Sequence, residues 1–395
     1  MTMSHSMTRR RAATGTSLVV VAGLMAAGCG DGGGTDAGTA STAGGSAATI
    51  AEPIAVTYDG GIAVLDGITL AVSKQVAVEG FTRLNPAGND RHMLVTTPAG
   101  WQVLDAGTGT MTDTTFAATD AGHVVTHAGT TVLFDDGTGK VTMFDPSDLG
   151  GETPPAVTEY TAPAPHHGVA VLSGDDLVVT EGTEDARTGI AVLGPDRKPK
   201  VRNTECPGVH GEAAAQNEVI AVGCENGMLL YRDGAIVKVT SPDPYGRIGN
   251  QAGSDSSPFL LGDYKTDEDA ELERPTQVSV VDTRTASLRL VDLGTSYTFR
   301  SLERGPSGEA LVLGTDGAVH SIDPASGRVT RSVQVVDAWE EPIEWQDPRP
   351  ALRVRGGTAY VTDPATRSLT TLDLGTFAVG KRVTLPGVPN EIATA

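Results

Sequence analysis

The chain has 395 residues, of which 39% are hydrophobic and only 4% aromatic, and its formal net charge is −20. This length and apolar content allow a sizeable core, whereas the acidic charge argues against nucleic acid as a partner, because phosphate-binding surfaces are basic. After the first 30 residues, no run is apolar for long enough to span a bilayer.

The N-terminal segment has the composition of an export signal. Arg9–Arg11 precede a short apolar stretch, and the run AAGC that ends at Cys29 resembles a bacterial lipobox. We therefore predict a signal peptide at residues 1–28, a lipidated Cys29 and a flexible tether at residues 29–52. The alternative is an ordinary cleaved signal. A lipidated chain would be held on the extracytoplasmic side of the cell membrane by its lipid anchor alone.

Short Val-, Ile- and Leu-rich runs bounded by Gly, Asp and Pro recur along the rest of the chain, which predicts an all-β protein. Many of these runs end in an aspartate turn, at spacings between 37 and 51 residues. A four-stranded unit that repeats at about 40 to 45 residues is typical of a β-propeller blade. The eight turn aspartates predict eight blades: Asp66, Asp105, Asp145, Asp196, Asp233, Asp282, Asp323 and Asp363.

A second series of residues, in register with the first, marks the expected start of each inner strand: Asn85, His123, His167, His210, Asn250, Arg300, Glu344 and Asn390. The last start leaves no room for a complete blade. We therefore expect residues 388–395 to supply the inner strand and residues 53–78 the outer three strands of one blade, so that residues 53–395 form a single domain. Seven blades with an irregular insertion are the alternative.

Two segments exceed a minimal blade, namely residues 254–276, which contain an acidic run, and residues 337–350, which mix tryptophans with acids. Solvated loops are the favoured interpretation of both segments, and a docking surface is the alternative.

The residues between Cys206 and Cys224 combine several signals. Two short apolar runs separated by Gln216–Glu218 predict an antiparallel hairpin that sets the two cysteines near each other. In an oxidising compartment they would form a disulfide worth about 3 kcal/mol. His210 and Glu212 lie two residues apart on the first strand, so they point to the same face.

The histidines are unevenly distributed. Three occupy equivalent blade starts 44 and 43 residues apart, namely His123, His167 and His210. Inner strands line the propeller channel, so these imidazoles are expected to converge with Glu212 and, if needed, a water molecule, as ligands of Zn²⁺.

Two further histidines lie beside this set. His166 and His167 point to opposite faces, so only one of them is expected to ligate, and His127 is about 13 Å along the strand from His123, as a supporting residue or a stop on an entry path. No enzyme motif is equally specific. Glu181 and the pair Asp135–Asp136 are weak candidates for catalytic carboxylates.

Several runs, among them GHVVTHAG, HHGVAV, VTEGTEDART, CPGVHGEAAA, GRIGNQAGS and VVDAW, resemble those of the AztD family of exported zinc chaperones. The resemblance covers most of the chain from about residue 53. It implies a β-propeller with zinc near its centre, a Cys206–Cys224 disulfide, no enzymatic activity, and delivery of zinc to the solute-binding protein of an ABC zinc importer. A propeller hydrolase or dehydrogenase and a metal-free envelope scaffold remain the alternatives.

Overall fold

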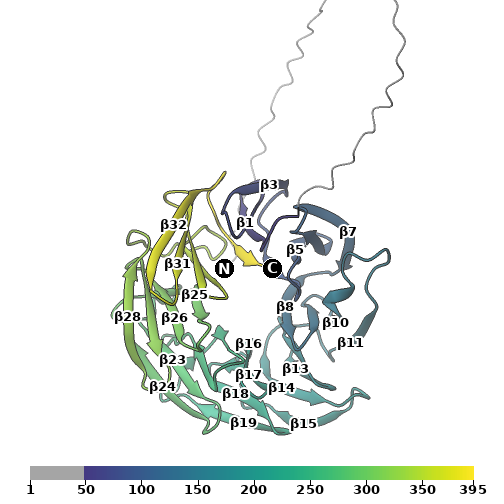
Figure 1. Cartoon of the computed structure of the whole chain (residues 1–395). Helices are drawn as coiled ribbons and strands as arrows, with labels where there is room; N and C mark the ends of the chain where they lie inside the picture. The colour runs from purple at the N-terminus through teal and green to yellow at the C-terminus, as the bar shows by residue number, and fades with distance from the viewer. Residues whose placement is uncertain (1–48) are drawn as a thin grey trace, which may run out of the picture. The chain divides into compact units, whose positions relative to one another are not determined.

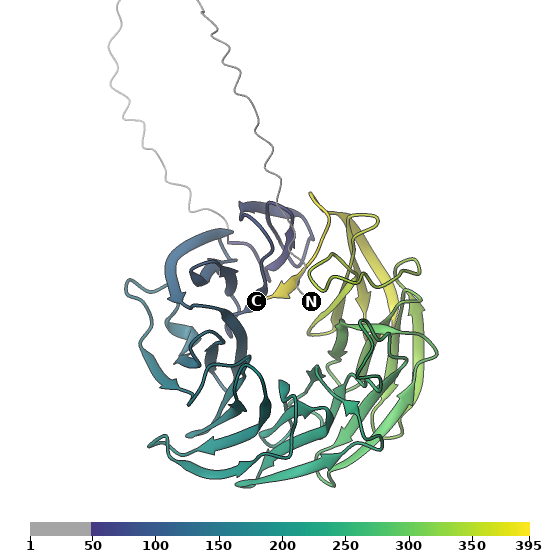
Figure 2. The same ribbon diagram turned by 180° about the vertical axis from the view of Figure 1, so that it is seen from behind.

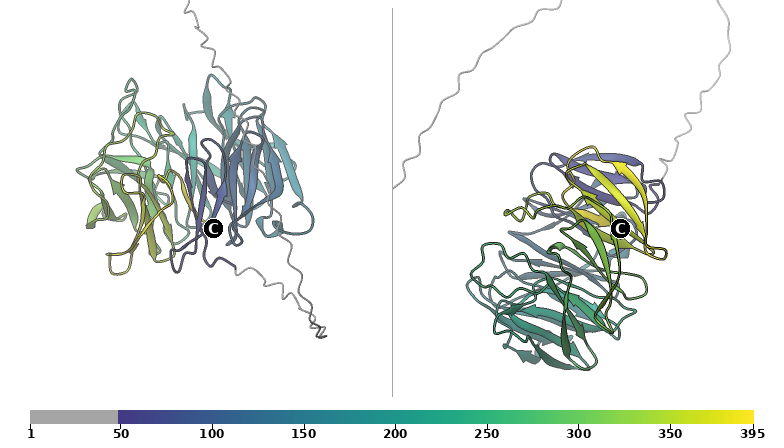
Figure 3. Two further views of the ribbon diagram at one scale, coloured as in Figure 1. Left: turned by 90° about the horizontal axis from the view of Figure 1, so that it is seen from above. Right: turned by 90° about the vertical axis from the view of Figure 1, so that its left-hand side faces the viewer.

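The computed structural model describes residues 49–395, and within this range the strands form eight antiparallel sheets around a common axis (Figure 1). Figures 2 and 3 show the same ring from behind, from above and from one side. This part of the chain is an eight-bladed β-propeller, as the aspartate repeat predicted. The predicted signal peptide, Cys29 and nearly all of the tether lie outside the described residues.

We number the blades from the one that holds β1. Blade 1 contains β1 (Ile54–Tyr58), β2 (Gly61–Leu65), β3 (Val72–Ala77) and β33 (Ile392–Thr394). Blade 2 contains β4 (Leu84–Pro86), β5 (His92–Thr97), β6 (Gly100–Asp105) and β7 (Thr110–Ala117). Blade 3 contains β8 (Ala121–His127), β9 (Thr130–Asp135), β10 (Lys140–Phe144) and β11 (Val157–Thr161), with the short helix η1 (Pro146–Asp148) between the last two strands. Blade 4 contains β12 (Ala170–Ser173), β13 (Asp176–Gly182), β14 (Arg187–Leu193) and β15 (Pro199–Asn203).

The second half of the ring continues the pattern. Blade 5 contains β16 (His210–Ala215), β17 (Val219–Cys224), β18 (Asn226–Arg232) and β19 (Ala235–Thr240), with β20 (Gly246–Arg247) paired to β18 in parallel. Blade 6 contains β21 (Gln251–Ala252), β22 (Phe259–Gly262), β23 (Gln277–Asp282) and β24 (Ser287–Asp292). Blade 7 contains β25 (Tyr297–Arg304), β26 (Ala310–Gly314), β27 (Ala318–Asp323) and β28 (Arg328–Gln334). Blade 8 contains β29 (Ala351–Arg355), β30 (Thr358–Asp363), β31 (Ser368–Asp373) and β32 (Ala378–Thr384).

The ring is closed by the two ends of the described chain. β33 pairs with β1 in antiparallel register, with Ile54 opposite Thr394 and Val56 opposite Ile392. In Figures 1 and 2 the yellow C-terminal strand accordingly lies beside the purple N-terminal strands. The predicted closure, an inner strand from the C-terminal end and three outer strands from the N-terminal end, is confirmed.

Two of the sixteen marker residues were placed wrongly. Asp363 ends β30, so it turns between the second and third strands of blade 8. The residue equivalent to the other turn aspartates is Asp373, whose carboxylate accepts the Thr376 backbone N–H at 2.7 Å. An Asp-Pro turn suits either junction, so the local sequence does not distinguish them. Glu344 precedes the inner strand β29 by several residues, because the segment before that strand forms a longer loop.

Apolar side chains fill the spaces between neighbouring blades. One buried cluster runs through blades 3, 4 and 5 and includes Val125, Val178, Ile190 and both Cys206 and Cys224. Another joins blade 8 to blade 1 through residues such as Tyr360 and Ile392. Within residues 49–395, no helix is long and apolar enough to cross a membrane.

The two long segments are more than solvated loops. Residues of both, including Lys265, Glu273, Glu341 and Trp345, line a cavity at the centre of the ring. The second segment is fixed by an ion pair between Arg349 and Glu341, at 2.9 Å, in which both side chains are almost fully buried. Such a pair would be costly to separate, because it would leave one buried charge without its partner.

We expect ring closure to be the weakest point of the domain. Ile392 is 3% exposed on β33, whereas Val388, four residues earlier, is 42% exposed. Ile392→Asp places an unpaired charge in the closing blade and should lower the free energy of unfolding by at least about 3 kcal/mol, whereas Val388→Asp should change it by less than about 0.5 kcal/mol. Urea unfolding followed by circular dichroism measures both, and equal stability of the two variants would contradict the closure.

Candidate metal centre

Three histidines from three consecutive blades meet at the centre of the ring. His123 lies on β8, His167 just before β12, and His210 at the start of β16. Their ring centroids are 5.0 to 5.2 Å apart, and one nitrogen from each lies within 4.8 Å of the others. The blade repeat therefore brings these three residues together, as their spacing predicted.

The hairpin that carries His210 also fixes the direction of its ring. Gly211 has a φ of +67°, and the register of β16 against β17 shifts between His210 and Ala213. A residue without a Cβ is favoured at this φ. The Nδ1–H of His210 donates to the backbone carbonyl of Gly249 at 2.6 Å, which leaves its Nε2 directed at His167.

A carboxylate fixes His167 in a similar way. Nδ1 of His167 lies 2.5 Å from Oδ2 of Asp136, and the other oxygen of Asp136 accepts the Gly168 backbone N–H at 3.2 Å. A carboxylate bonded to one imidazole nitrogen holds the proton there and directs the second nitrogen to a metal. Asp136 follows the end of β9, so blade 3 orients a histidine of blade 4.

These two contacts leave an unusual arrangement of lone pairs. A carbonyl and a carboxylate are acceptors, so both Nδ1 atoms carry protons and both Nε2 atoms of the neutral rings are acceptors. The two Nε2 atoms are 3.1 Å apart. Two facing lone pairs at this distance repel each other unless a cation or a proton lies between them.

Burial disfavours protonation of His210 and His123. Desolvation lowers the pKa of His210 to about 3, helped by the positive charges of Arg247 and Arg187 and by His167. Desolvation also lowers the pKa of His123 well below the usual histidine value, and the charges of the neighbouring histidines and Arg83 act in the same direction. Neutral imidazoles are therefore the stable form of His123 and His210 at neutral pH.

Glu212 lies next to the triad. Its Oε2 is 3.7 Å from Nδ1 of His123, and burial raises the pKa of its carboxyl group to about 8. The group of side chains whose ligand atoms lie within 4.8 Å of one another contains the three histidines and does not include Glu212. A cation bound nearby would favour the charged form of the Glu212 carboxyl group.

The two neighbouring histidines, His166 and His127, form hydrogen bonds with other groups. His166 is 2% exposed, with its two ring nitrogens 2.9 Å from the Ala164 carbonyl and 3.0 Å from the Thr180 hydroxyl. His127 contacts Glu218 at 2.7 Å. Neither residue belongs to the group of three histidines whose nitrogens converge.

The histidine site opens onto a cavity of about 690 Å³, which His123, His167 and His210 line together. Two groups that orient His167 and His210 have no clear signal in the sequence. Asp136 is predicted there only as a weak catalytic candidate, and the Gly249 carbonyl carries no signal at all. The position of Asp136 at the end of a strand, one blade before His167, is the only feature of the sequence that indicates its contact with His167.

The disulfide connects the chain just before His210 to β17. Cys206 and Cys224 are bonded, with their Cα atoms 4.9 Å apart, and both side chains are fully buried. In the same hairpin, His210 pairs with Gly223, the neighbour of Cys224. The hairpin and its disulfide agree with the sequence prediction.

No family model matches the chain. A search of known sequences finds the zinc chaperone AztD of Citrobacter koseri, 28% identical over 283 residues, which are 69% of this chain and 64% of that protein. This chain is homologous to that zinc chaperone. The matched region therefore covers slightly less than two thirds of the AztD chain.

Solved structures agree on the fold. Two structures of AztD from Citrobacter koseri, one of them titled as the apo form, match with a TM-score of 0.74 at 24% identity, over 87% of this chain and 96% of theirs. The dihydro-heme d1 dehydrogenase NirN matches with a TM-score of 0.61 at 11% identity, over 88% of this chain and 75% of its own. At these identities the matches to AztD and NirN establish the propeller fold alone.

Removing the disulfide should weaken the hairpin. The Cys206→Ser/Cys224→Ser double variant loses a cross-link across 18 positions, and we expect the free energy of unfolding to fall by about 3 kcal/mol. Zinc affinity should decrease without being abolished, because the Gly249 contact and the β16–β17 pairing still hold His210. Urea unfolding and chelator competition measure the two effects, and an unchanged unfolding midpoint would refute the structural role of the disulfide.

Proposed function

We propose that this protein binds one Zn²⁺ ion through His123, His167 and His210 and acts as an extracytoplasmic zinc chaperone. The observation that carries the proposal is the pair of Nε2 atoms 3.1 Å apart, each turned to the other by an acceptor at its own Nδ1. This arrangement is favourable only with a cation or a proton between the two nitrogens, and the burial of His210 opposes the proton. Three imidazoles with an available carboxylate form a donor set that suits Zn²⁺.

The geometry suits transfer of the metal better than permanent storage. The side chain of His167 is 46% exposed, and the site opens onto a cavity rather than lying within a closed core. A partner that offers its own ligands would therefore reach the metal without unfolding of the propeller. We further propose that zinc is the cargo and that the protein has no enzymatic activity.

The recipient and the location follow from the family resemblance. We propose that zinc passes to the solute-binding protein of an ABC zinc importer, and that a lipid on Cys29 anchors the chain to the cell membrane. Anchoring both proteins to one surface would raise their effective concentration. The homology to a protein named as a zinc chaperone supports the cargo, and the lipobox-like run supports the anchor.

Single substitutions distinguish ligands from neighbours. His123→Ala, His167→Ala and His210→Ala should each lower zinc affinity by more than 100-fold, because each removes a direct ligand. Asp136→Asn, which keeps the shape but weakens the hold on His167, should cost about 10- to 100-fold. His127→Ala is the matched control and should bind zinc as the wild type does, because its imidazole contacts Glu218 instead.

Chelator competition gives these affinities, and circular dichroism establishes that each variant is folded. His166→Ala is expected to lower stability more than affinity, because both of its nitrogens are bonded within the core. Wild-type affinity in folded variants of the three proposed ligands would eliminate this site. Elemental analysis of the purified protein further separates a zinc carrier from a metal-free scaffold, and an absorbance spectrum tests for the cofactor of a propeller dehydrogenase.

The pH dependence should reflect Glu212 more than His123 and His210. A ligand must lose its proton before it binds the metal, and the Glu212 pKa is about 8 whereas the His210 pKa is about 3. If Glu212 ligates, affinity should rise about tenfold per pH unit from pH 6 to 8 and then level off. Glu212→Gln should remove this slope. Proton competition at His210 should begin well below the range near pH 6.5 that is usual for histidine.

Zinc titrations with a competing chelator at several pH values measure this dependence. A wild-type affinity that does not change between pH 6 and 8 would exclude Glu212 as a ligand and leave the fourth position to water.

A further inference from the structure

A second group of charged residues lies beside the metal centre and has no part in holding the histidines. A cavity of about 220 Å³ is lined by His123 and Glu212 together with three guanidinium groups, those of Arg83, Arg300 and Arg353. Arg83 precedes β4, Arg300 lies on β25 and Arg353 on β29. Arginines from blades 2, 7 and 8 therefore share one cavity with a histidine of blade 3, in a protein whose net charge is −20.

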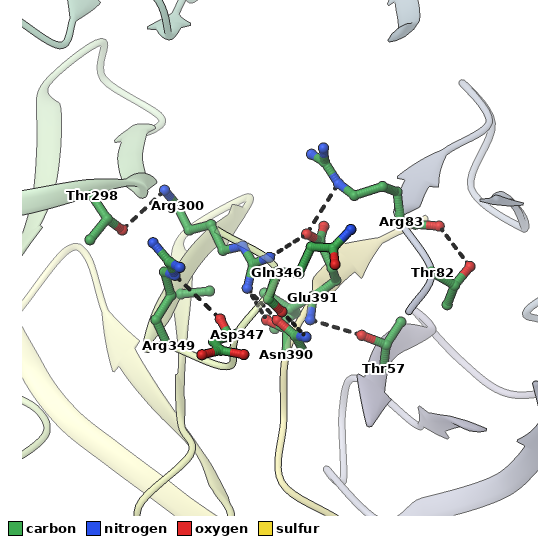
Figure 4. A network of polar contacts seen from close by, with 12 residues as sticks. Thr57, Thr82, Arg83, Thr298, Arg300, Gln346, Asp347, Arg349, Asn390 and Glu391 are labelled. Atoms are coloured by element: carbon green, nitrogen blue, oxygen red, sulfur yellow. Dashed lines mark hydrogen bonds and ion pairs between the residues drawn. The ribbon is translucent and has the colours of Figure 1, made fainter. Parts of the chain in front are cut away.

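Two of these arginines share a single carboxylate (Figure 4). Oε1 of Glu391 lies 3.1 Å from Nε of Arg83 and 2.8 Å from Nη2 of Arg300. The side chains of Glu391 and Arg300 are 6% and 7% exposed. Two positive charges and one negative charge leave this group with one uncompensated positive charge in a partly desolvated place.

The other arginines of the region have their own partners. Arg353 pairs with Glu303 at 2.6 Å and donates to the Ile392 carbonyl at 3.1 Å. Arg349 pairs with Glu341 at 2.9 Å. Because these two pairs are neutral overall, the positive charge in excess belongs to Arg83 and Arg300.

These two arginines also retain unused donors. Nη1 of Arg300 donates to the Asn390 backbone carbonyl at 3.2 Å, whereas its Nε is buried and has no hydrogen-bond partner among residues 49–395. In the same part of the chain the two Nη groups of Arg83 make no hydrogen bond or ion pair, and Figure 4 shows them at the free end of the side chain, beyond the nitrogen that faces Glu391. A buried donor without an acceptor costs free energy, which an incoming acceptor would recover.

We propose that this cavity binds a small free carboxylate anion, held by Arg83 and Arg300, next to the zinc ion. A planar guanidinium matches a carboxylate with two parallel hydrogen bonds, and a carboxylate oxygen is a normal zinc ligand. Zinc would otherwise add two positive charges beside an uncompensated guanidinium. An anion between them turns this repulsion into attraction, and it would take the zinc position that the three histidines leave open in place of Glu212 or water.

The inference rests on the proposed zinc site and predicts a coupling between the two ligands. Zinc and the anion should each strengthen the binding of the other by the same factor, since such linkage is reciprocal. Release of the anion would then weaken the hold on zinc, and the protein would respond to the carboxylate content of its surroundings.

The experiment compares zinc affinity in acetate and in perchlorate at equal pH and ionic strength, by chelator competition calibrated separately in each salt. Acetate is the probe for the carboxylate, and perchlorate is a weakly coordinating reference. For the wild type we expect affinity about tenfold higher in acetate, within the usual range of such couplings. Equal affinity in the two salts would overturn the proposal on its own.

Variants locate the effect. Arg83→Gln removes an arginine whose side chain is 43% exposed and whose Nε lies 3.1 Å from a glutamate, and it should reduce the acetate effect to less than about twofold. Arg202→Gln is the matched control, because Arg202 is 53% exposed and its Nε also lies 3.1 Å from a glutamate, Glu181, away from this cavity. It should keep the full acetate effect.

Arg83→Lys keeps the charge but loses the planar donor pair, and it serves if Arg83→Gln is not folded. We expect a partial loss of the acetate effect in this variant, and a full effect in either variant would refute the role of Arg83. The two proposals fail separately. Wild-type protein that binds no zinc in either salt contradicts the metal site, whereas tight binding that is independent of acetate contradicts only the anion site.

Discussion

The antiparallel pairing of β33 with β1 is the contact on which the rest of this structure depends. It joins the two ends of the described chain within one blade and converts eight separate sheets into a closed ring. Only in a closed ring do the inner strands of all blades face one centre. The histidine site uses residues of three consecutive blades, whereas the arginine group joins blades 2, 7 and 8, which are distant in sequence, so the arginine group exists because the ring is closed. Glu391 lies directly before the closing strand β33 and forms ion pairs with arginines of blades 2 and 7, so ring closure also positions the arginine group.

The proposed metal centre is already organised in the structure. The acceptors at the Nδ1 atoms of His167 and His210 lie in neighbouring blades, and the packing of the blades fixes their positions. Burial keeps the imidazoles of His123 and His210 neutral, so protons compete poorly for the nitrogens that face the centre. A site prepared in this way loses little conformational entropy on binding. Because the side chain of His167 is 46% exposed, a zinc ion at the proposed site would remain accessible to the proposed recipient.

The two sides of the centre have opposite electrostatic character. Neutral nitrogens and a carboxyl group form one side, and guanidinium groups that exceed their counter-charges form the other. Cations and anions are therefore expected to bind as a pair. The long segments at residues 254–276 and 337–350 add to this environment, because their residues line the cavity above it and the buried pair of Arg349 and Glu341 fixes the second segment.

The sequence by itself determined the features that follow from local patterns. Aspartate turns at near-regular spacing predicted eight blades, and the spacing of His123, His167 and His210 placed them at equivalent positions, because strand periodicity is encoded within each repeat. The disulfide followed from one hairpin. Only the tertiary structure decided which groups meet between blades. Asp136 orients His167 and the Gly249 carbonyl orients His210. His166 turns into the core, and Asp373 rather than Asp363 occupies the repeated turn of blade 8. These contacts depend on how sheets pack against each other, and side-chain packing between distant segments leaves no periodic trace in the chain.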